Sequence, residues 1–267
     1  MAFEINLTGK VALVTGGATG IGAATCIALA CAGATIALNC FPDKNNTQEK
    51  PADAENVVRT IRKMGGTVEM FPGDVSDEAW DRQAVEDIVG RWGRIDILVN
   101  NAVLFQRFKM LDLTTDVFRR MFEVNVMGPF VLSQACIPHM LEQGGGSIIF
   151  ISSSNVVNGG GDTPAYPACK GALEGMMKNM VKEFGKKAIR TNVIRPSVIV
   201  TPPFIKRYTE EQWNAYLSCI PTARAGKPED VANLIVYLCD DEKAAYLNGG
   251  VYHVDGARIH QIHPTSN

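Results

Sequence analysis

Two side chains with complementary chemistry stand four residues apart, Tyr166 and Lys170. Residues at this spacing lie on one face of a helix, so the phenol and the ammonium group can meet there. A nearby positive charge lowers the pKa of a phenol, and a tyrosine tuned in this way can give or take a proton. The spacing therefore predicts a proton-transfer pair, although taken alone it would indicate only an ordinary surface pair.

A glycine-rich segment near the N-terminus could bind phosphate. It runs from Thr15 to Gly22, directly after an apolar run and directly before a helical pattern that begins at Ala23. Glycine permits a tight turn and a close approach of the backbone, while the N-H groups and dipole of a helix N-terminus favour negative charge. This context favours the diphosphate of a nucleotide; an ordinary tight strand-to-helix turn is the alternative.

Seven short apolar runs could form the strands that carry these motifs. They alternate with longer segments of helical period, as in repeated βαβ units, and several are apolar at consecutive positions, which is typical of strands covered on both faces. We therefore expect an α/β fold, a single Rossmann-type doubly wound domain over residues 1–267, with a seven-stranded parallel sheet flanked by helices. The expected strands are 11–15, 35–39, 67–71, 95–100, 147–152, 190–195 and 250–254.

Composition excludes several classes of partner. The 267 residues carry 26 basic and 28 acidic side chains, a net charge of -2, which leaves no electrostatic footprint for nucleic acid or an anionic membrane. The seven cysteines are an odd number without a C-x-x-C pair, so we expect reduced thiols and a cytoplasmic protein without a leader or membrane span. His260 and His263 lack further ligands nearby, so no metal is expected.

The glycine spacing G-x-x-x-G-x-G, with Thr15 before it, resembles the short-chain dehydrogenase/reductase superfamily. Further motifs follow in the order found in that family, over about residues 9 to 256. The resemblance implies an NAD(P)(H)-dependent oxidoreductase that interconverts a secondary alcohol and a ketone by hydride transfer, with tyrosine as general acid/base. The motifs are Asp74-Val75, Asn100-Asn101-Ala102, Asn125-Val126-Met127-Gly128, Ser153, Tyr166-Pro167-Ala168-Cys169-Lys170 and Pro196.

The resemblance also implies roles for four catalytic residues. Besides acting on Tyr166, Lys170 would hold the hydroxyl groups of the nicotinamide ribose. Ser153 would bond the substrate oxygen, and Asn125 would hold a water that continues the proton relay. Ser153 precedes Tyr166 by the family's usual 13 residues, which favours it over its neighbours Ser152 and Ser154.

The cofactor site implied by the resemblance draws on several strand ends. Asp74 and Val75 would lie at the adenine, although Asp74 could instead help to cap the following helix. The second strand ends without an acid before Asp43, which slightly favours NADP(H) over NAD(H), even though Thr19 stands where many NADP-dependent relatives carry a basic residue. The expected cofactor-binding residues are Gly16, Thr19, Gly20, Ile21, Gly22, Asn39, Lys44, Asp74, Val75, Asn101, Ala102, Tyr166, Lys170, Pro196, Val198 and Thr201.

Two departures from the family pattern fall beside the expected nicotinamide site. Val103 and Ser197 replace glycines that usually follow Asn-Asn-Ala and Pro196. Both substitutions change backbone freedom, so substrate orientation is where this chain should differ from its relatives.

The substrate pocket should form beyond the carboxyl ends of the strands, from residues 104–107 and 155–158 and a lid over about residues 197–220. The lid is rich in aromatic and aliphatic residues, so we expect a small-molecule substrate, namely a bulky hydrophobic carbonyl or secondary alcohol: a steroid, a polyketide or an aromatic ketone. The alternatives are a 3-oxoacyl thioester reductase, a sugar dehydrogenase, a nucleotide-sugar epimerase or dehydratase, and a non-catalytic nucleotide-binding regulator.

Two apolar helical stretches could pack subunits together. Residues 117–141 and 171–184 resemble the two helices that pair into a four-helix bundle in oligomers of the family. Packing is the preferred interpretation of the methionine-rich stripe within 171–184, because a role in substrate binding would require it to face a strand end. We expect a homo-oligomer, first of all a tetramer, otherwise a dimer.

Overall fold

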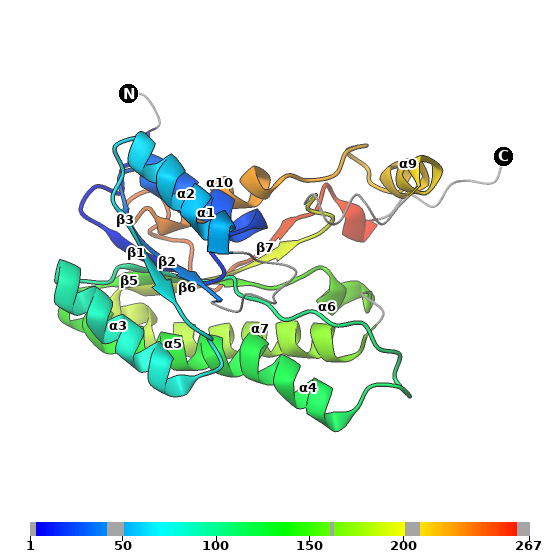
Figure 1. Ribbon diagram of the computed structural model, residues 1–267, viewed down its shortest axis with the longest axis horizontal. Coiled ribbons are helices and arrows are strands. Elements are labelled where there is room, and N and C mark those ends of the chain that lie inside the picture. Colours follow the sequence, from blue (N-terminus) through cyan, green and yellow to red (C-terminus); the bar gives the residue numbers. More distant parts are fainter. Residues whose placement is uncertain (1–3, 42–50, 161–162, 201–208, 261–267) are drawn as a thin grey trace.

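A single twisted sheet of seven parallel strands forms the centre of the molecule (Figure 1). The computed structural model describes residues 4–41, 51–160, 163–200 and 209–260. The strand order is β3-β2-β1-β4-β5-β6-β7, so the chain works outward from β1 in one direction and then from β4 in the other. The strands are β1 Val11–Val14, β2 Thr35–Cys40, β3 Val68–Pro72, β4 Ile97–Asn100, β5 Gly146–Ile151, β6 Ile189–Pro196 and β7 Val251–Val254.

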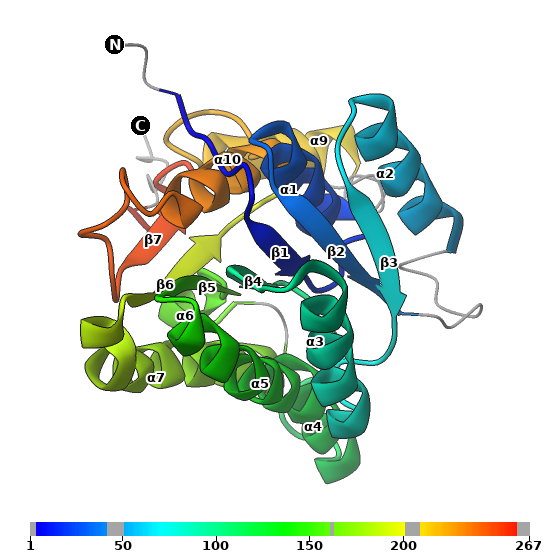
Figure 2. The same ribbon diagram turned by 90° about the vertical axis from the view of Figure 1, so that its left-hand side faces the viewer.

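Helices cover both faces of the sheet, which makes the domain doubly wound (Figure 2). On one face lie α1 Gly20–Cys31, α2 Pro51–Lys63 and α10 Pro228–Cys239; on the other lie α3 Glu78–Trp92, α4 Thr115–Phe122, α5 Gly128–Glu142 and α7 Ala165–Phe184. The shorter elements are η1 Glu123–Met127, α6 Asn155–Asn158, η2 Gly185–Lys187, α9 Glu210–Ser218 and η3 Arg258–His260.

The apolar runs of the sequence explain this layering. Each strand of the central pair, β1 and β4, is buried at every position and sends alternate side chains into two separate cores. Ala12 and Val14 pack under α1 and α10, whereas Val11 and Leu13 pack over α3 and α5. The fold expected from the sequence is confirmed, and all seven strands lie within two residues of their expected bounds.

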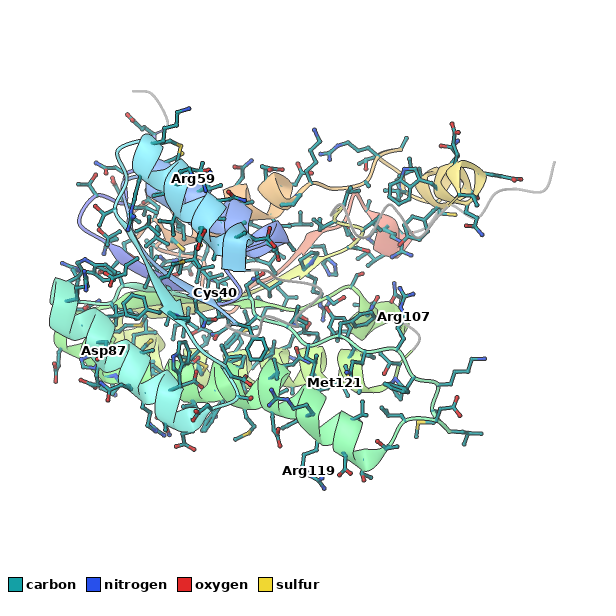
Figure 3. All side chains as sticks on the ribbon, in the orientation of Figure 1. Cys40, Arg59, Asp87, Arg107, Arg119 and Met121 are labelled. Carbon is teal, nitrogen blue, oxygen red and sulfur yellow. The ribbon has the colours of Figure 1, made fainter. Side chains whose placement is uncertain are left out.

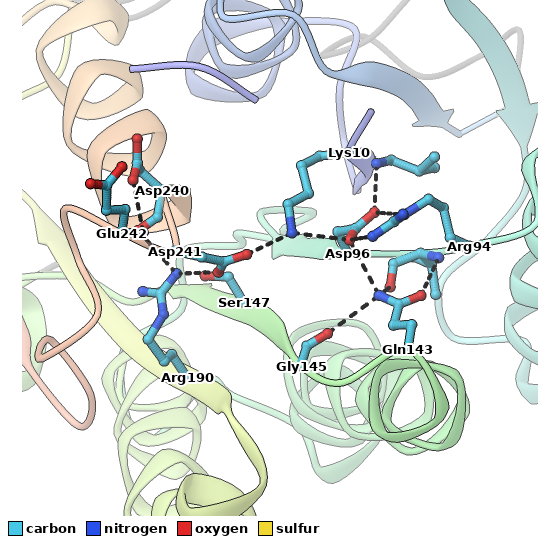
Figure 4. A network of polar contacts seen from close by, with 12 residues as sticks. Lys10, Arg94, Asp96, Gln143, Gly145, Ser147, Arg190, Asp240, Asp241 and Glu242 are labelled. Carbon is cyan, nitrogen blue, oxygen red and sulfur yellow. Dashed lines mark hydrogen bonds and ion pairs between the residues drawn. The ribbon is translucent and has the colours of Figure 1, made fainter. Parts of the chain in front are cut away.

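The amino-terminal edge of the sheet is held by a network of charges (Figure 4). The buried Asp96 carboxylate accepts hydrogen bonds from Arg94 Nη2 at 2.6 Å and from the Val11 backbone at 2.9 Å, and it forms an ion pair with Lys10 Nζ at 3.3 Å. Lys10 also pairs with Asp241, which in turn pairs with Arg190. This network ties β1 to β4 and to the segment after α10, at the end of the sheet opposite to the site described next.

Candidate functional site

The residues expected to do the chemistry meet at the carboxyl end of β5. Tyr166 and Lys170 lie on the first turns of α7, and Lys170 Nζ is 5.7 Å from the centroid of the Tyr166 ring. The lysine is 2% exposed and donates a 2.7 Å hydrogen bond to the Ile151 carbonyl at the end of β5. Ser153, two residues after that strand end, lines the same pocket as Tyr166, and its hydroxyl acts to lower the pKa of the phenol. The helix spacing and the strand end thus bring three predicted catalytic residues together.

The electrostatics of the pair differ from the sequence-based expectation. Burial raises the pKa of Tyr166 to about 12, and only the hydrogen bond with Ser153 works in the opposite direction. Burial also lowers the pKa of Lys170 to about 8. The sequence predicts that the lysine lowers the pKa of the phenol; instead desolvation dominates, because it disfavours the charged form of both groups, and Lys170 contributes no offsetting attraction. In the part of the chain that the structure describes, Lys170 forms no ion pair with a carboxylate.

The three consecutive serines after β5 have different surroundings. Ser152 is turned away from Tyr166, with Oγ 2.8 Å from a Glu174 carboxylate oxygen. Ser153 Oγ accepts a hydrogen bond from the Asn155 backbone, and the same hydroxyl acts to lower the pKa of Tyr166. Ser154 is buried, and its backbone N-H bonds the Pro196 carbonyl. Of the three, the structure therefore brings Ser153 to the tyrosine.

Asn125 lies in a single π-helical turn, η1, and its side chain is already occupied. Its amide nitrogen donates to the Leu104 carbonyl at 2.8 Å, and its amide oxygen accepts from the Leu104 N-H at 3.0 Å. The side chain thus fixes the segment after β4, so a relay water expected at Asn125 would have to bind its main chain. Pro129, four residues later, has no N-H, so the Asn125 carbonyl lacks its usual α-helical donor and is the better candidate for a water.

The glycine turn leads from β1 into the N-terminus of α1, as the motif predicts. A Cβ at Gly22 would lie 2.0 Å from the Gly16 carbonyl oxygen, so no larger residue fits there. Gly16 and Gly20 have φ of +60° and +52°, the left-handed region that favours glycine. The Thr19 side chain makes no capping hydrogen bond to α1. A close-packed glycine cradle at an uncapped helix N-terminus fits a diphosphate.

Two polar side chains hold this turn in shape. Asn101 donates from its amide to the Thr15 and Gly16 carbonyls at 2.9 and 3.0 Å. The Thr15 hydroxyl accepts from the backbone N-H groups of Asn101 and Ala102, both at 2.9 Å. Thr15 was not among the expected site residues, although its place beside the glycine motif was a signal for it.

Other expected cofactor residues prove to be partly or wholly engaged within the protein. Asn39 is buried, accepting from the Gly16 N-H and donating to the Phe71 and Gly73 carbonyls, so it supports the turn rather than facing outward. Val75 is buried in the core under the helices. Lys44 and Thr201 lie outside the described residues.

Asp74 is held by neighbours from two elements. It accepts from the Ser76 backbone and hydroxyl and forms a 2.6 Å ion pair with Arg120 of α4. Although burial opposes it, these hydrogen bonds lower the pKa of Asp74. The N-cap of α3 is Asp77, whose carboxylate accepts from the first turn, so the capping role considered for Asp74 belongs to its neighbour.

An open pocket joins the glycine turn to the catalytic pair. Its walls include Ile21 and Asn101 from the cofactor side, Ser153, Tyr166 and Lys170, and the segment from Pro196 to Ile199. Val103, one of the two unusual residues, also lines it and is 44% exposed. The pocket thus connects the expected phosphate-binding turn with the expected proton-transfer pair.

The unusual backbone after β6 lies at Val198, one residue after Ser197, where the missing glycine had drawn attention. Val198 has a φ of +53°, which is strained for a β-branched residue, and hydrogen bonds between residues 198–200 and Gly226 hold it there. Ser197 accepts a 3.0 Å hydrogen bond from Arg258, whose guanidinium lies 4.7 Å from the Tyr216 ring centroid. The sequence carried no signal for Arg258.

The expected lid contains α9, none of whose residues is buried. Figure 1 shows this helix (gold) standing away from the sheet, at the same side as the carboxyl ends of β6 and β7. The Trp213 and Tyr216 rings are stacked at 5.9 Å along it. Residues 201–208, which contain two of the expected lid aromatics, Phe204 and Tyr208, lie outside the described residues.

Over the described residues, no helix is both long and apolar enough to cross a membrane. Over the same residues no group of His, Cys, Asp or Glu side chains has the arrangement of a metal site.

Comparison with known proteins agrees with this geometry. A family model described as enoyl-(acyl carrier protein) reductase matches residues 16–257. The chain is 33% identical over 255 residues to the 3-oxoacyl-(acyl-carrier-protein) reductase of Thermotoga maritima, covering 96% of this chain and 100% of that protein. It is 34% identical over 252 residues to the L-rhamnose 1-dehydrogenase (NAD(P)(+)) of a Sphingomonas species, with 94% and 96% covered.

A solved structure extends the likeness to three dimensions. A 7α-hydroxysteroid dehydrogenase complexed with NADH and 7-oxo glycochenodeoxycholic acid matches with a TM-score of 0.86 and 32% identity over 95% of each chain. The three descriptions name one reductase and two dehydrogenases, two of them with a nicotinamide cofactor, and three different substrates. The chain belongs to the short-chain dehydrogenase/reductase superfamily and is an NAD(P)(H)-dependent oxidoreductase.

Proposed function

We propose that Tyr166 is the general acid/base of this oxidoreductase, that Ser153 orients the substrate oxygen, and that Lys170 binds the nicotinamide ribose and promotes ionisation of the tyrosine. The meeting of Ser153, Tyr166 and Lys170 at one end of the pocket supports this most directly. When bound, the nicotinamide supplies or accepts the hydride. The glycine turn, Asn101 and Lys170 would hold it, and Tyr166 would move the accompanying proton.

The proton step follows from the surroundings of the pair. In ketone reduction the Tyr166 hydroxyl donates its proton to the carbonyl oxygen, and in alcohol oxidation the phenolate takes it back. A phenol with a pKa of about 12 is almost wholly protonated at neutral pH, so oxidation requires a protonated Lys170 nearby to stabilise the phenolate. The Asn125 carbonyl, at the π-turn, would bond a water that returns the proton to solvent.

Tyr166→Phe tests this assignment. It removes one hydroxyl and keeps the ring, so turnover should fall by about 10³-fold while cofactor affinity stays within about threefold. Affinity is measured by nicotinamide fluorescence and turnover by nicotinamide absorbance. Retained turnover would contradict the role of Tyr166; a wild-type protein that binds cofactor but turns over no substrate would favour the regulator alternative.

We propose NADP(H) as the preferred cofactor. The Asn39 side chain is used inside the protein, and residues 38–41 at the end of β2 include no carboxylate that would repel a 2'-phosphate. Initial rates with the two cofactors at equal concentration test this preference, and a large preference for NAD(H) would contradict it.

We propose a bulky hydrophobic carbonyl or secondary alcohol as the substrate. Phe105 makes an edge-to-face contact with Tyr166, with centroids 4.8 Å apart, and so places an aromatic ring beside the proposed acid/base. Val103 and Val157, 44% and 53% exposed, add apolar surface on the neighbouring segments. Arg107, labelled in Figure 3, lies 5.7 Å from the Phe105 ring centroid.

A substrate panel decides between this proposal and its alternatives. Steroid, polyketide-like and aromatic ketones should be reduced with kcat/KM at least about tenfold above aldoses and 3-oxoacyl thioesters, because the apolar walls offer few fixed polar partners. The likeness to a 3-oxoacyl-(acyl-carrier-protein) reductase makes the thioester the second candidate. Faster turnover of the thioester or of a sugar would overturn the apolar assignment.

We propose a homotetramer in a reducing, cytoplasmic environment. Met127 and Phe130, at the start of α5, are each 43% exposed, which suits an apolar surface that another subunit covers. All seven cysteines are free, which suits reducing conditions. Light scattering at micromolar concentration tests the assembly, and a monomer would contradict it.

A further inference from the structure

Behind the proposed catalytic pair lies a buried polar cluster of Ser152, Glu174 and Arg195, here called the clamp. Glu174 is on α7, one helical turn after Lys170, and Arg195 is on β6. The guanidinium contacts both carboxylate oxygens, Nε at 2.7 Å from Oε1 and Nη2 on Oε2, and Ser152 Oγ donates to Oε1 at 2.8 Å. The side chains of Glu174 and Arg195 are 9% and 16% exposed, so this is a largely desolvated ion pair.

The clamp touches the catalytic lysine through the strand end. Lys170 Nζ donates to the Ile151 carbonyl at 2.7 Å, and Ser152 Oγ lies 3.3 Å from the Lys170 carbonyl. Two consecutive residues of the chain therefore hold the ammonium group and the main chain of the same lysine. Ser153 follows directly and meets Tyr166. The Glu174 carboxylate holds Ser152, which lies between the two residues that contact the catalytic pair: Ile151, whose carbonyl accepts from Lys170, and Ser153, which acts on Tyr166.

Other charged or titratable groups around the lysine are Tyr166 and Cys169 on its own helix and, across Arg195, two residues of the β7 region. His253 Nε2 is 3.3 Å from Arg195 Nη1, and Asp255 is 3.9 Å from His253 Nδ1. Buried charges act over longer distances than exposed ones, because the effective dielectric constant is low. While they are paired, Glu174 and Arg195 present little net charge to Lys170. If one of them is removed, the other presents a full uncompensated charge.

We propose that the clamp is a positioning element of the active site, in which Glu174 locks Ser152 and thereby Ser153 and Lys170, and Arg195 cancels the charge that the carboxylate would otherwise impose on the Lys170–Tyr166 pair. The inference rests on the proposed roles of those two residues. It assigns a positioning role to the three residues of the clamp, Ser152, Glu174 and Arg195.

The test exploits the opposite charges of the two partners. Binding of NADPH and of NADH, followed by nicotinamide fluorescence between about pH 6 and pH 10, should weaken as Lys170 loses its proton near its pKa of about 8. We call this fall in cofactor affinity with rising pH the limb. Lys170→Met should abolish the limb, which would assign it to Lys170. Glu174→Gln leaves a positive charge and should move the limb to lower pH, whereas Arg195→Met leaves a negative charge and should move it to higher pH. Each shift should be on the order of half a pH unit.

Three further variants separate charge from structure. Ser152→Ala changes no charge, so the limb should stay in place while kcat falls about tenfold and cofactor affinity is kept. Arg195→Lys keeps the charge and should restore the wild-type limb, which covers the case that Arg195→Met does not fold. Arg224→Met breaks the exposed ion pair of Arg224 with Asp230 and is the matched control, with no shift expected.

The outcomes distinguish this inference from the proposed function. If Glu174→Gln and Arg195→Met are folded and shift the limb in the same direction, or not at all, or if Ser152→Ala keeps the full kcat, the clamp is merely structural and the inference fails. If Lys170→Met leaves cofactor affinity and its pH limb unchanged, the proposed role of Lys170 fails instead.

Discussion

The two ends of the sheet each hold buried charge, and they treat it in opposite ways. At the amino end, Asp96 is buried but compensated by Arg94 and Lys10, both within 3.3 Å. At the carboxyl end, Lys170 is equally buried but donates to a carbonyl, and Tyr166 beside it is a neutral phenol. The paired Asp96 stabilises the fold; at the unpaired Lys170 and its neighbour Tyr166 burial shifts both pKa values, which is the usual mark of groups used in chemistry.

Exchanging the same residue at the two ends should give the largest contrast. Lys170→Met should lower kcat/KM by about 10²- to 10⁴-fold, because it removes the cation that assists Tyr166 and binds the ribose. Lys10→Met at the amino end should leave kcat/KM within about twofold. Nicotinamide absorbance measures both, with the best substrate of the panel. Equal effects would mean that the two buried networks are not functionally distinct.

Breaking the compensated end should cost stability rather than activity. Asp96→Ala removes the acceptor of Arg94 and Lys10, and we expect the free energy of unfolding to fall by about 3 kcal/mol, since the remaining cations are partly solvated. Urea denaturation measures the loss. A decrease below about 1 kcal/mol would show that the network is not a main support of the sheet.

Another carboxyl group extends the comparison, because it is buried without a hydrogen-bond or ion-pair partner in the described part of the chain. Both oxygens of Asp81, on α3, lack a hydrogen-bond partner within the described residues, and burial followed by the nearby Asp77 and Asp74 raises its pKa to about 8. Between about pH 4, the pKa of an unfolded aspartate, and pH 8, the folded state binds the extra proton. Stability should therefore fall as the pH rises through this window and level off above it.

Asp81→Asn should remove that dependence. At pH 5 the variant and the wild type should differ by less than about 1 kcal/mol, while at pH 8 the variant should be about 2 kcal/mol more stable, allowing for relaxation around the charge. Urea denaturation at the two pH values measures the difference. An equal difference at both would show that Asp81 is already charged in the fold at pH 5.

The smallest expected effect concerns the unusual serine after β6. Ser197→Gly removes the hydroxyl that accepts from Arg258 and frees the backbone beside the strained Val198. We expect KM for the substrate to rise by about three- to tenfold with kcat nearly unchanged, from the loss of about 1 kcal/mol of ordering in the pocket wall. Steady-state kinetics measure the split; a fall in kcat alone would place Ser197 in the chemical step.

Much of this architecture could be predicted from the sequence, for local reasons. Consecutive apolar residues such as Ile148 to Ile151 indicate a strand covered on both faces, and the spacing of Gly16, Gly20 and Gly22 indicates a turn into a helix. Tyr166 and Lys170 share a helix face because four residues make about one turn. These signals depend only on neighbours along the chain.

The partners of the polar side chains could not be predicted in this way. Asn125, for instance, bonds the backbone of Leu104 from 21 residues away, and Asn39 turns inward to Gly16. Along the chain, only the interval of 13 residues before Tyr166 distinguished Ser153 from Ser152, the serine of the clamp. Such assignments depend on which distant segment arrives beside each side chain.

Periodicity and glycine geometry act over a few residues, so they suffice to predict the sheet, the glycine turn and the helix that carries Tyr166 and Lys170. The sign of the Tyr166 pKa shift, the different contacts of Ser152 and Ser153, and the pairing of Glu174 with Arg195 emerge only from the folded molecule. The physical reason is that desolvation and ion pairing are properties of the packed environment, which the order of residues does not display.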